Sequence, residues 1–451
     1  MKNKHLIIIG GGLAGTEAAW QAAQRGIKVT LYEMRPETTT PAHRTSNLAE
    51  IVCSNSMGSN LPNHASYILI NELRSLGSLL LQCAELNSVP AGGALAVDRE
   101  RFSQIVTEKI SNHKNINLIR KEIKTIPDDP TIIASGPLTS SGLVKSIQSF
   151  FNQENLIFYD AISPIVEYDS INMNTAFFGS RYGKGSKKSG DYINCPMNKS
   201  EYTKFVEEII NARQINLNNI DQNIKSGVNA QFNNYFEACL PIEVLAARDV
   251  NALAFGPMKP IGIHHPYSNQ HYYAIVQLRQ DNIAATLFNL VGFQTNLTYV
   301  EQKRVFRMIP GLVNAEFVRY GSMHRNTFIC SPTILISTYQ TLKKSNLFFA
   351  GQITGIEGYL GNISSGLVAG INAARFLKEE PLLIFPKDSM IGALSNYISK
   401  SNPVHFQPMK ANLGLLPPLE EYIPSKQLRA AEYEKRSADG IKKMISDNQP
   451  W

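Results

Sequence analysis

The chain has 451 residues, 43% hydrophobic and 18% charged, which excludes a disordered or low-complexity protein. Its 44 Lys and Arg against 37 Asp and Glu give a formal net charge of +7, which permits a polyanionic partner without requiring one. At roughly 150 residues per domain, the length predicts two or three domains. No apolar run approaches the roughly 20 residues of a membrane span, and no export signal precedes the first strand, so we expect no membrane association.

The first forty residues carry the clearest local signal. An apolar run at 6–9 predicts a buried parallel strand, which continues into a G-x-G-x-x-G sequence at 10–15. A helix is expected from there to about Arg25, and a second strand at 29–33 ends in the acid Glu33. Glycines alone would be a weak signal, but strand, glycines, helix, strand and acid in this order are typical of a dinucleotide-binding βαβ unit.

Each part of this unit has a physical task. Gly10 allows the tight turn, Gly12 lets the backbone approach a pyrophosphate, and Gly15 lets helix and strand pack closely. The helix N-terminus offers unpaired N–H groups to the phosphates. Glu33 is placed to accept hydrogen bonds from ribose hydroxyls. The cofactor-binding residues predicted here are Gly10, Gly11, Gly12, Leu13, Ala14, Gly15 and Glu33.

Two later apolar segments, 131–136 and 347–352, each run into a glycine and are predicted to be strands of the same sheet. The second is followed by a helix rich in small residues at 364–374, which can pack close to a ligand or to the sheet. Flavoproteins that bind FAD in an extended pose commonly use such a distant element, so FAD is favoured over NAD as the tightly held cofactor. Gly351 and Gln352 are therefore added to the predicted cofactor site.

The middle of the chain differs in sequence pattern from the two ends, and this difference predicts an inserted domain. We expect an α/β protein in which a Rossmann-like FAD-binding domain, formed by 1–165 and 321–451, carries an inserted α+β substrate domain at 166–320. A basic, glycine-rich stretch at 181–188 indicates a loop or hairpin tip. The chain ends in a helical tail, with a polar helix expected at about 425–444.

The five cysteines contain no C-x-x-C pair and lie far apart, which argues against a disulfide framework or a zinc site and favours a reducing cytoplasm. The histidines give no metal signature, so no metal is expected. Cys53 and Cys239 stand in polar segments, and a reactive cysteine must be partly a thiolate. The alternative for each is a buried small hydrophobic residue.

Longer motifs along the chain match one known family in order. The matching segments are 12–15, 32–36, 53–56, 89–99, 255–260, 276–281, 323–327, 350–355, 406–409 and 414–417. On these segments the chain resembles the folate- and FAD-dependent tRNA (uracil-5-)-methyltransferase family, the small Gid-type flavoproteins, along essentially its whole length.

The resemblance implies a Gid/glutathione-reductase-type fold and an enzyme that forms 5-methyluridine in the tRNA T-loop. The carbon comes from 5,10-methylenetetrahydrofolate and the electrons from NAD(P)H through FAD. Because uracil C5 becomes nucleophilic when a thiolate adds to C6, the chemistry needs a cysteine. By resemblance, Cys239 is the C6 nucleophile, Cys53 the second active-site thiol, and Glu243 a candidate for proton transfer. Tyr359 is a candidate for stacking near the flavin or the pterin, with an ordinary core tyrosine as the alternative.

The chain departs from the family pattern at Ala238, where a glycine is usual, and after Tyr359 and 53–56. The departures after Tyr359 and after 53–56 leave open the same chemistry on ribosomal RNA or another tRNA uridine. Two alternatives from different classes are a small-molecule FAD oxidoreductase and an RNA-binding flavoprotein without catalysis. Residues 179–200 hold five Lys and Arg against one acid, and residues 425–451 hold six against four. Both segments are candidates for contact with RNA phosphates, and the alternative for the terminal helix is an ordinary solvated surface helix of mixed charge.

Overall fold

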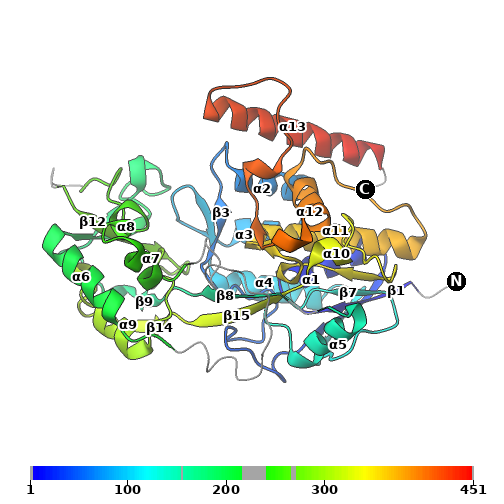
Figure 1. Cartoon of the computed structure of the whole chain (residues 1–451), viewed down its shortest axis with the longest axis horizontal. Coiled ribbons are helices and arrows are strands. Elements are labelled where there is room, and N and C mark those ends of the chain that lie inside the picture. Colours follow the sequence, from blue (N-terminus) through cyan, green and yellow to red (C-terminus); the bar gives the residue numbers. More distant parts are fainter. Residues whose placement is uncertain (1–3, 154–155, 216–239, 266–270, 449–451) are drawn as a thin grey trace.

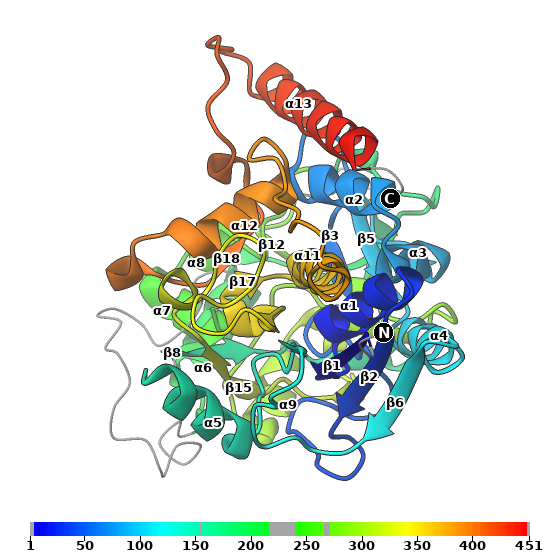
Figure 2. The same cartoon turned by 90° about the vertical axis from the view of Figure 1, so that its right-hand side faces the viewer.

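Residues 4–153, 156–215, 240–265 and 271–448 are described by a computed structural model of the chain (Figure 1, Figure 2). Figure 1 shows a larger body that contains both ends of the chain and a smaller body beside it. Over the described ranges, no helix is both long enough and apolar enough to cross a lipid bilayer.

The larger body is built on a five-stranded parallel sheet with the order β16-β7-β1-β2-β6. Its strands are β1 (His5–Ile9), β2 (Lys28–Glu33), β6 (Ile116–Arg120), β7 (Thr131–Ile133) and β16 (Leu347–Phe349). A parallel strand is covered on both faces, which explains why the central strand β1 is a continuous apolar run. The four strands predicted from the sequence all lie in this sheet.

Helices surround this sheet, and most of them are in the two outer portions of the chain. They are α1 (Leu13–Gln24), α2 (Ala65–Ser75), α3 (Leu79–Leu86), α4 (Arg99–Ser111), α5 (Ser141–Phe151), α10 (Ser331–Ile334), α11 (Tyr359–Lys378), α12 (Met390–Lys400) and α13 (Lys426–Asp447). Small ladders join the periphery: β3 (Ser56–Ser59), β4 (Ser88–Val89) and β5 (Ala94–Val97) form one, and β17 (Ile356–Glu357) pairs with β18 (Met409–Lys410).

The helices α1 and α11 touch through their backbones. A Cβ added at Gly366 would lie 2.2 Å from the carbonyl oxygen of Ala14, and one at Gly370 would lie 2.6 Å from that of Ala18. Larger residues would force the helices apart. This contact explains the run of small residues predicted as a helix, which begins at Tyr359, five residues earlier than expected.

The smaller body contains a six-stranded antiparallel sheet with the order β10-β11-β12-β13-β9-β14. Its elements are β9 (Ile165–Glu167), β10 (Phe177–Gly179), β11 (Tyr192–Met197), β12 (Ala274–Gln280), β13 (Leu287–Leu290), β14 (Phe317–Arg319), α6 (Lys199–Asn211), α7 (Ile242–Arg248), α8 (Ala252–Phe255) and α9 (Tyr299–Phe306). The chain enters and leaves it through the antiparallel pair β8 (Leu156–Ala161) and β15 (Met323–Phe328). The predicted α/β fold, a Rossmann-like FAD-binding type with an inserted α+β domain, is confirmed.

Two separate hydrophobic clusters fill the two bodies. One gathers buried side chains from Leu6 to Ile147 and from Ile329 to Met444, and the other gathers those from Val166 to Ala315. We propose the domain boundaries 1–165, 166–320 and 321–451, and this separation of the clusters supports them.

The C-terminal helix α13 is fastened to the larger body through a buried carboxylate. Glu72 on α2 accepts hydrogen bonds from the backbone N–H groups of Met390 and Ile391, at the start of α12, and from the Ser437 hydroxyl on α13. Figure 1 and Figure 2 both show α13 lying across α2. Burial raises the pKa of Glu72 from its ordinary value of 4.5 to about 7.

This raised pKa predicts a pH dependence of stability. Between pH 4.5 and 7 the folded protein holds a proton on Glu72 that the unfolded chain releases, so the stabilisation is present below pH 4.5 and lost as pH rises to 7. We expect Glu72→Gln to abolish this component, up to about 3 kcal/mol, in urea titrations at pH 5 and pH 7.5. An unchanged difference between the two pH values in the variant would contradict the role of Glu72.

Candidate active site

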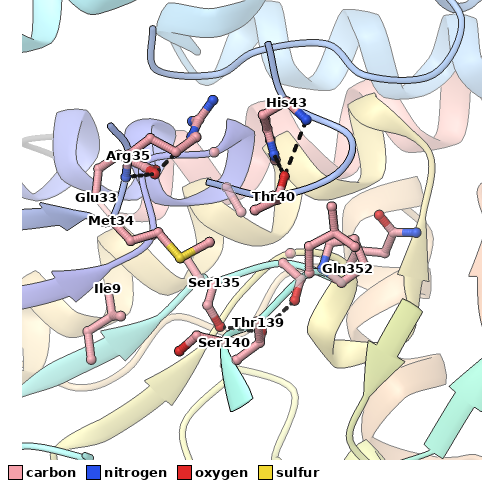
Figure 3. Close-up of a pocket in the computed structure, with 18 of the residues that line it drawn as sticks. Ile9, Glu33, Met34, Arg35, Thr40, His43, Ser135, Thr139, Ser140 and Gln352 are labelled. Carbon is pink, nitrogen blue, oxygen red and sulfur yellow. Dashed lines mark hydrogen bonds and ion pairs between the residues drawn. The ribbon is translucent and has the colours of Figure 1, made fainter. Parts of the chain in front are cut away.

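A pocket opens where the parallel strands of the larger body end. Its empty volume is about 990 Å³, open solvent included. It is lined at the ends of β1, β2 and β7 and by the segment after β16 (Figure 3). Of the predicted cofactor residues, those in its wall are Gly10, Gly12, Leu13, Ala14, Glu33, Gly351, Gln352 and Tyr359. The crevice at the carboxyl ends of such a sheet is where ligands bind.

The glycines at the start of α1 divide into two kinds. Gly10 has φ +106°, and a Cβ on Gly15 would lie 1.8 Å from the carbonyl oxygen of Gly10, so the backbone itself requires both. A Cβ on Gly12, in contrast, would meet no protein atom within 4 Å, although Gly12 lines the pocket. No protein atom of the described residues fills the space beside the Cα atom of Gly12, so a ligand can occupy it. Gly11 donates its N–H to Glu33 at 2.9 Å.

A second helix presents its N-terminus to the same pocket. Tyr359 and Asn362, in the first turn of α11, are both in the pocket wall. The Oδ1 atom of Asn362 is buried and has no hydrogen-bond partner. Buried polar atoms are almost always paired, so this oxygen indicates a ligand donor. The two helix N-termini, of α1 and α11, add positive dipole ends suited to phosphate.

Glu33, at the end of β2, is held in a charged network in the wall of the same pocket. Its carboxylate accepts from the backbone N–H and the Nε of Arg35, and the Nη1 of Arg35 donates to Glu50 at 3.0 Å (Figure 3). Burial alone would raise the pKa of Glu33, but the hydrogen bonds and charge of Arg35 outweigh it and lower the pKa. Glu33 is thus an ionised acceptor facing the pocket. Its bond to a ribose stays a prediction.

His43 contributes a neutral polar group to the pocket wall. Burial, assisted by the charge of Arg35, lowers its pKa to about 4, so the ring is uncharged at neutral pH. Its Nδ1 lies 2.6 Å from the hydroxyl of Thr40 (Figure 3). Together, the open space at Gly12, the unpaired Asn362 oxygen, two helix N-termini and an acid at the end of β2 fit an extended dinucleotide cofactor.

Tyr359 links this pocket to the first predicted cysteine. Its side chain lines the pocket, and its hydroxyl accepts a hydrogen bond from the backbone N–H of Cys53 at 2.9 Å. Burial raises the pKa of Tyr359 above its ordinary value, and the charge of Cys53 raises it further, so the hydroxyl stays protonated. Cys53 is half-buried, with its Sγ 3.9 Å from the carbonyl oxygen of Ala161.

Two arginines from different domains hold the backbone just before Cys53. The Nη1 of Arg99 donates to the carbonyl oxygen of Ile51 at 2.9 Å, and the Nη2 of Arg319 donates to that of Val52 at 2.5 Å. Both guanidiniums interact electrostatically with Cys53. Burial lowers the pKa of Arg319 to about 10, so it remains charged at neutral pH.

Arg99 is itself fixed by a buried acid. Its Nε lies 3.0 and 2.9 Å from the two carboxylate oxygens of Asp281. Although burial opposes it, the charge of Asp281 raises the pKa of Arg99. Its Nη2 atom is buried and has no hydrogen-bond partner, so this site holds a spare, charged donor.

Beneath Cys53, the buried Asn55 joins three segments that are far apart in sequence. Its side-chain amide donates to the carbonyl oxygens of Val97 and Gln280, and its Oδ1 accepts from the Nε of Arg279 at 2.8 Å. The sequence motifs at 53–56, 89–99 and 276–281 therefore meet at a single point between the two domains.

Two further predicted residues have different outcomes. Cys239 lies outside the described residues, and its role stays a prediction. Glu243, at the start of α7, is buried, and its two oxygens accept from the backbone N–H of Asn296 and the hydroxyl of Thr295. Burial raises its pKa. In the structure Glu243 serves the inserted domain as a buried hydrogen-bond acceptor. Its part in proton transfer also stays a prediction.

Several residues of the site were not singled out from the sequence. They are Arg35, Glu50, Arg99, Asp281, Arg319 and Asn362. Arg35, Arg99 and Asp281 lie in the motifs at 32–36, 89–99 and 276–281, and membership of these motifs was the sign in the sequence that they have a role. Within the described ranges, no group of three or more His, Cys, Asp and Glu side chains is arranged to hold a metal ion.

These features define a flavoprotein of the two-domain Rossmann type, and comparison with known proteins agrees. The profile of the family described as Glucose inhibited division protein A (GIDA) matches residues 5–381. The structure of Aquifex aeolicus GidA in its form I crystal superposes with a TM-score of 0.66 over 98% of this chain and 78% of that one, at 16% identity, which shows a shared fold.

Sequence relatives narrow the class. The chain is 52% identical to "Methylenetetrahydrofolate--tRNA-(uracil-5-)-methyltransferase TrmFO" of Natranaerobius thermophilus over 95% of this chain and 96% of that protein. It is 51% identical to the protein of the same name from Bacillus pumilus, over 96% and 97%. The chain belongs to the TrmFO family.

The two kinds of glycine give a matched pair of variants. We expect Gly12→Ala to keep the melting temperature of the FAD-free protein within about 2 °C but to weaken FAD binding at least tenfold, because the methyl group enters the cofactor space. Gly15→Ala should instead destabilise the fold by about 3 kcal/mol, as overpacking does. Flavin absorbance per protein and thermal melts report the two effects. Full FAD content in Gly12→Ala would show that the pocket is misassigned.

Proposed function

We propose that the chain is an RNA methyltransferase that forms 5-methyluridine in the T-loop of tRNA. The carbon comes from 5,10-methylenetetrahydrofolate, and NAD(P)H is the reductant, with FAD as the bound cofactor. Relatives of the same length, about 50% identical, carry the corresponding enzyme name. We also propose a cytoplasmic location, which the widely spaced cysteines and the tRNA substrate support.

The observation that carries the proposal is the position of Tyr359. One side chain both lines the cofactor pocket and bonds the backbone of Cys53, so the pocket and the thiol belong to one site. A flavoprotein that only oxidises a small metabolite has no need for a half-buried thiol that interacts electrostatically with two guanidiniums.

The bound FAD would supply the redox capacity of the site, and Gly12, the N-terminus of α11 and Glu33 would hold it. At the uracil, the thiolate of Cys239 forms a bond to C6, and the π electrons of the C5–C6 double bond shift toward C5 and the C4 carbonyl oxygen. C5 bonds to the methylene carbon, and a base removes the C5 proton as the bond between that carbon and its nitrogen donor breaks, which leaves an exocyclic methylene on the uracil. A hydride equivalent, which NAD(P)H would supply through the bound FAD, reduces this methylene to the methyl group, and the thiolate leaves C6 as the C5–C6 double bond re-forms.

Cys53 is the second thiol of this scheme and acts as the base or as part of a proton relay. Negative charge on its sulfur and positive charge on Arg99 and Arg319 stabilise one another. The unpaired Nη2 of Arg99 adds to the site a charged donor of the kind that stabilises an oxygen on which negative charge develops.

A direct test supplies the protein with methylenetetrahydrofolate labelled in the transferred carbon, NADH and an unmodified tRNA transcript. We expect label in 5-methyluridine of the T-loop, located by nuclease mapping and mass spectrometry. Label confined to ribosomal RNA or to another uridine would reassign the substrate, and the absence of label from every RNA would refute the methyltransferase.

A variant separates the nucleophile from the cofactor site in the same assay. Cys239→Ala should keep its bound FAD but lose both the label and the covalent protein–RNA adduct that is seen on denaturing gels. Turnover at the rate of the unmodified protein would overturn the assignment of Cys239.

Arg99 and Arg319, which we call the arginine clamp, predict that Cys53 is more reactive than an ordinary cysteine. Arg319→Gln should slow the alkylation of Cys53 by iodoacetamide at pH 7.5 by about threefold to tenfold, because a charge that favours the thiolate is lost. Arg319→Lys should keep most of the rate. The control is Arg74→Gln, which removes an exposed arginine paired with Glu85.

Mass spectrometry of the peptide that contains Cys53 gives the rate for this thiol alone. Equal rates in Arg319→Gln, Arg319→Lys and the Arg74→Gln control would show that the clamp leaves the thiol unaffected.

A further inference from the structure

A stack of three aromatic rings runs from the core of the inserted domain to its surface. The rings of Phe317 and Tyr320 lie 5.3 Å apart between centroids and 16° from parallel, and those of Tyr320 and Tyr299 lie 5.1 Å apart and 22° from parallel. Phe317 packs in turn on the buried ring of Phe306. Tyr299 is 55% exposed, so the stack ends at solvent.

Cationic side chains surround the exposed end of the stack. A shallow hollow beside it is lined by Tyr299, Val300, Lys303, Arg304, Arg307 and Tyr320. Tyr299 and Lys303 lie four residues apart and so share one side of α9, and Arg307 directly follows the helix. Arg304 pairs with Glu208, and Arg307 with Glu316, in exposed contacts that contribute little and can exchange for phosphate, while Arg304 also pairs with the buried Glu301. Lys303 has no carboxylate partner in the described part of the chain.

The stack is braced by hydrogen bonds, and one of its rings is next in sequence to a residue of the candidate active site. The side chain of Gln302 on α9 both donates to and accepts from the backbone of Gly321, which fixes α9 against Tyr320. Tyr320 directly follows Arg319, the residue that bonds the backbone beside Cys53. Figure 1 shows α9 and β14 at the edge of the smaller body.

We propose that Tyr299 is a stacking platform for an unpaired base of the tRNA substrate, next to the uridine that enters the active site. Near-parallel rings that end at solvent extend their stack with any base, and neighbouring cations hold its phosphate. This inference rests on the proposed function, because it takes tRNA to be the polyanion.

The test places 2-aminopurine, which loses fluorescence when it stacks, in an RNA hairpin with the sequence of the T-arm, at positions flanking the target uridine. With the FAD-loaded protein, we expect quenching at one flanking position. Tyr299→Ala should abolish that quenching and weaken hairpin binding about tenfold, whereas Tyr299→Phe should stay within about twofold. Tyr422→Ala, which removes another exposed tyrosine, serves as the matched control.

Charge is tested separately from stacking. Lys303→Gln should reduce the slope of log affinity against log salt concentration by about 0.7, the value for one phosphate contact on a single strand. FAD content should be unchanged in all these variants.

Each result bears on the proposal. Equal quenching and equal affinity in the unmodified protein and Tyr299→Ala would overturn it. So would a change of oligomeric state in Tyr299→Ala with hairpin affinity unchanged, because the surface would then bind a second copy of the chain. Hairpin binding and fluorescence quenching are measured without turnover. A failure of methylation would therefore contradict the proposed function, while the binding and quenching data would still decide whether Tyr299 stacks on a base.

Discussion

The backbone contact between α1 and α11 is the constraint on which the site depends. Gly366 and Gly370 let the two helices approach until their main chains touch, and this places both helix N-termini at one pocket. The two helices come from segments more than 300 residues apart, and the inserted domain stands between them in sequence. A wider separation would move Tyr359 and Asn362 away from the Gly12 turn and divide the pocket. The dinucleotide site is thus a property of helix packing as much as of its glycine-rich turn.

The second layer of the site is built across the domain boundary. Arg99 and Asn55 belong to the larger body, whereas Asp281, Arg279 and Arg319 belong to the inserted domain. These charged and amide groups are buried where the domains meet, and burial of polar groups is favourable only when they are paired. Their mutual bonds therefore fix the relative position of the domains and the backbone around Cys53 at the same time. Tyr359 joins this junction to the cofactor pocket.

Much of the fold was predictable from local pattern, and much of the site was not. Strand β1, the glycine turn and Glu33 obey short-range rules, and the strands at 131–136 and 347–352 were recognisable as apolar runs that end in glycine. The packing of α11 on α1 was not predictable, because a run of small residues is equally suited to a ligand, a sheet or another helix. Arg99, Asp281 and Arg319 escaped attention for a similar reason. A lone arginine in a sequence gives no sign of whether it faces water or a buried acid. Arg99 and Asp281 stand in the longer motifs, which hinted at a role, whereas Arg319 stands in none of them.

The reach of Arg319 has a consequence for how the parts of the molecule depend on one another. The cofactor pocket is enclosed by the larger body alone, but the strand that bears Arg319 belongs to the inserted domain. A chain from which that domain was excised would keep the walls for the dinucleotide and lose one of the two clamps on the thiol segment. Cofactor retention and thiol reactivity are therefore separable properties. The first depends on the larger body alone, and the second depends on the larger body and the inserted domain together.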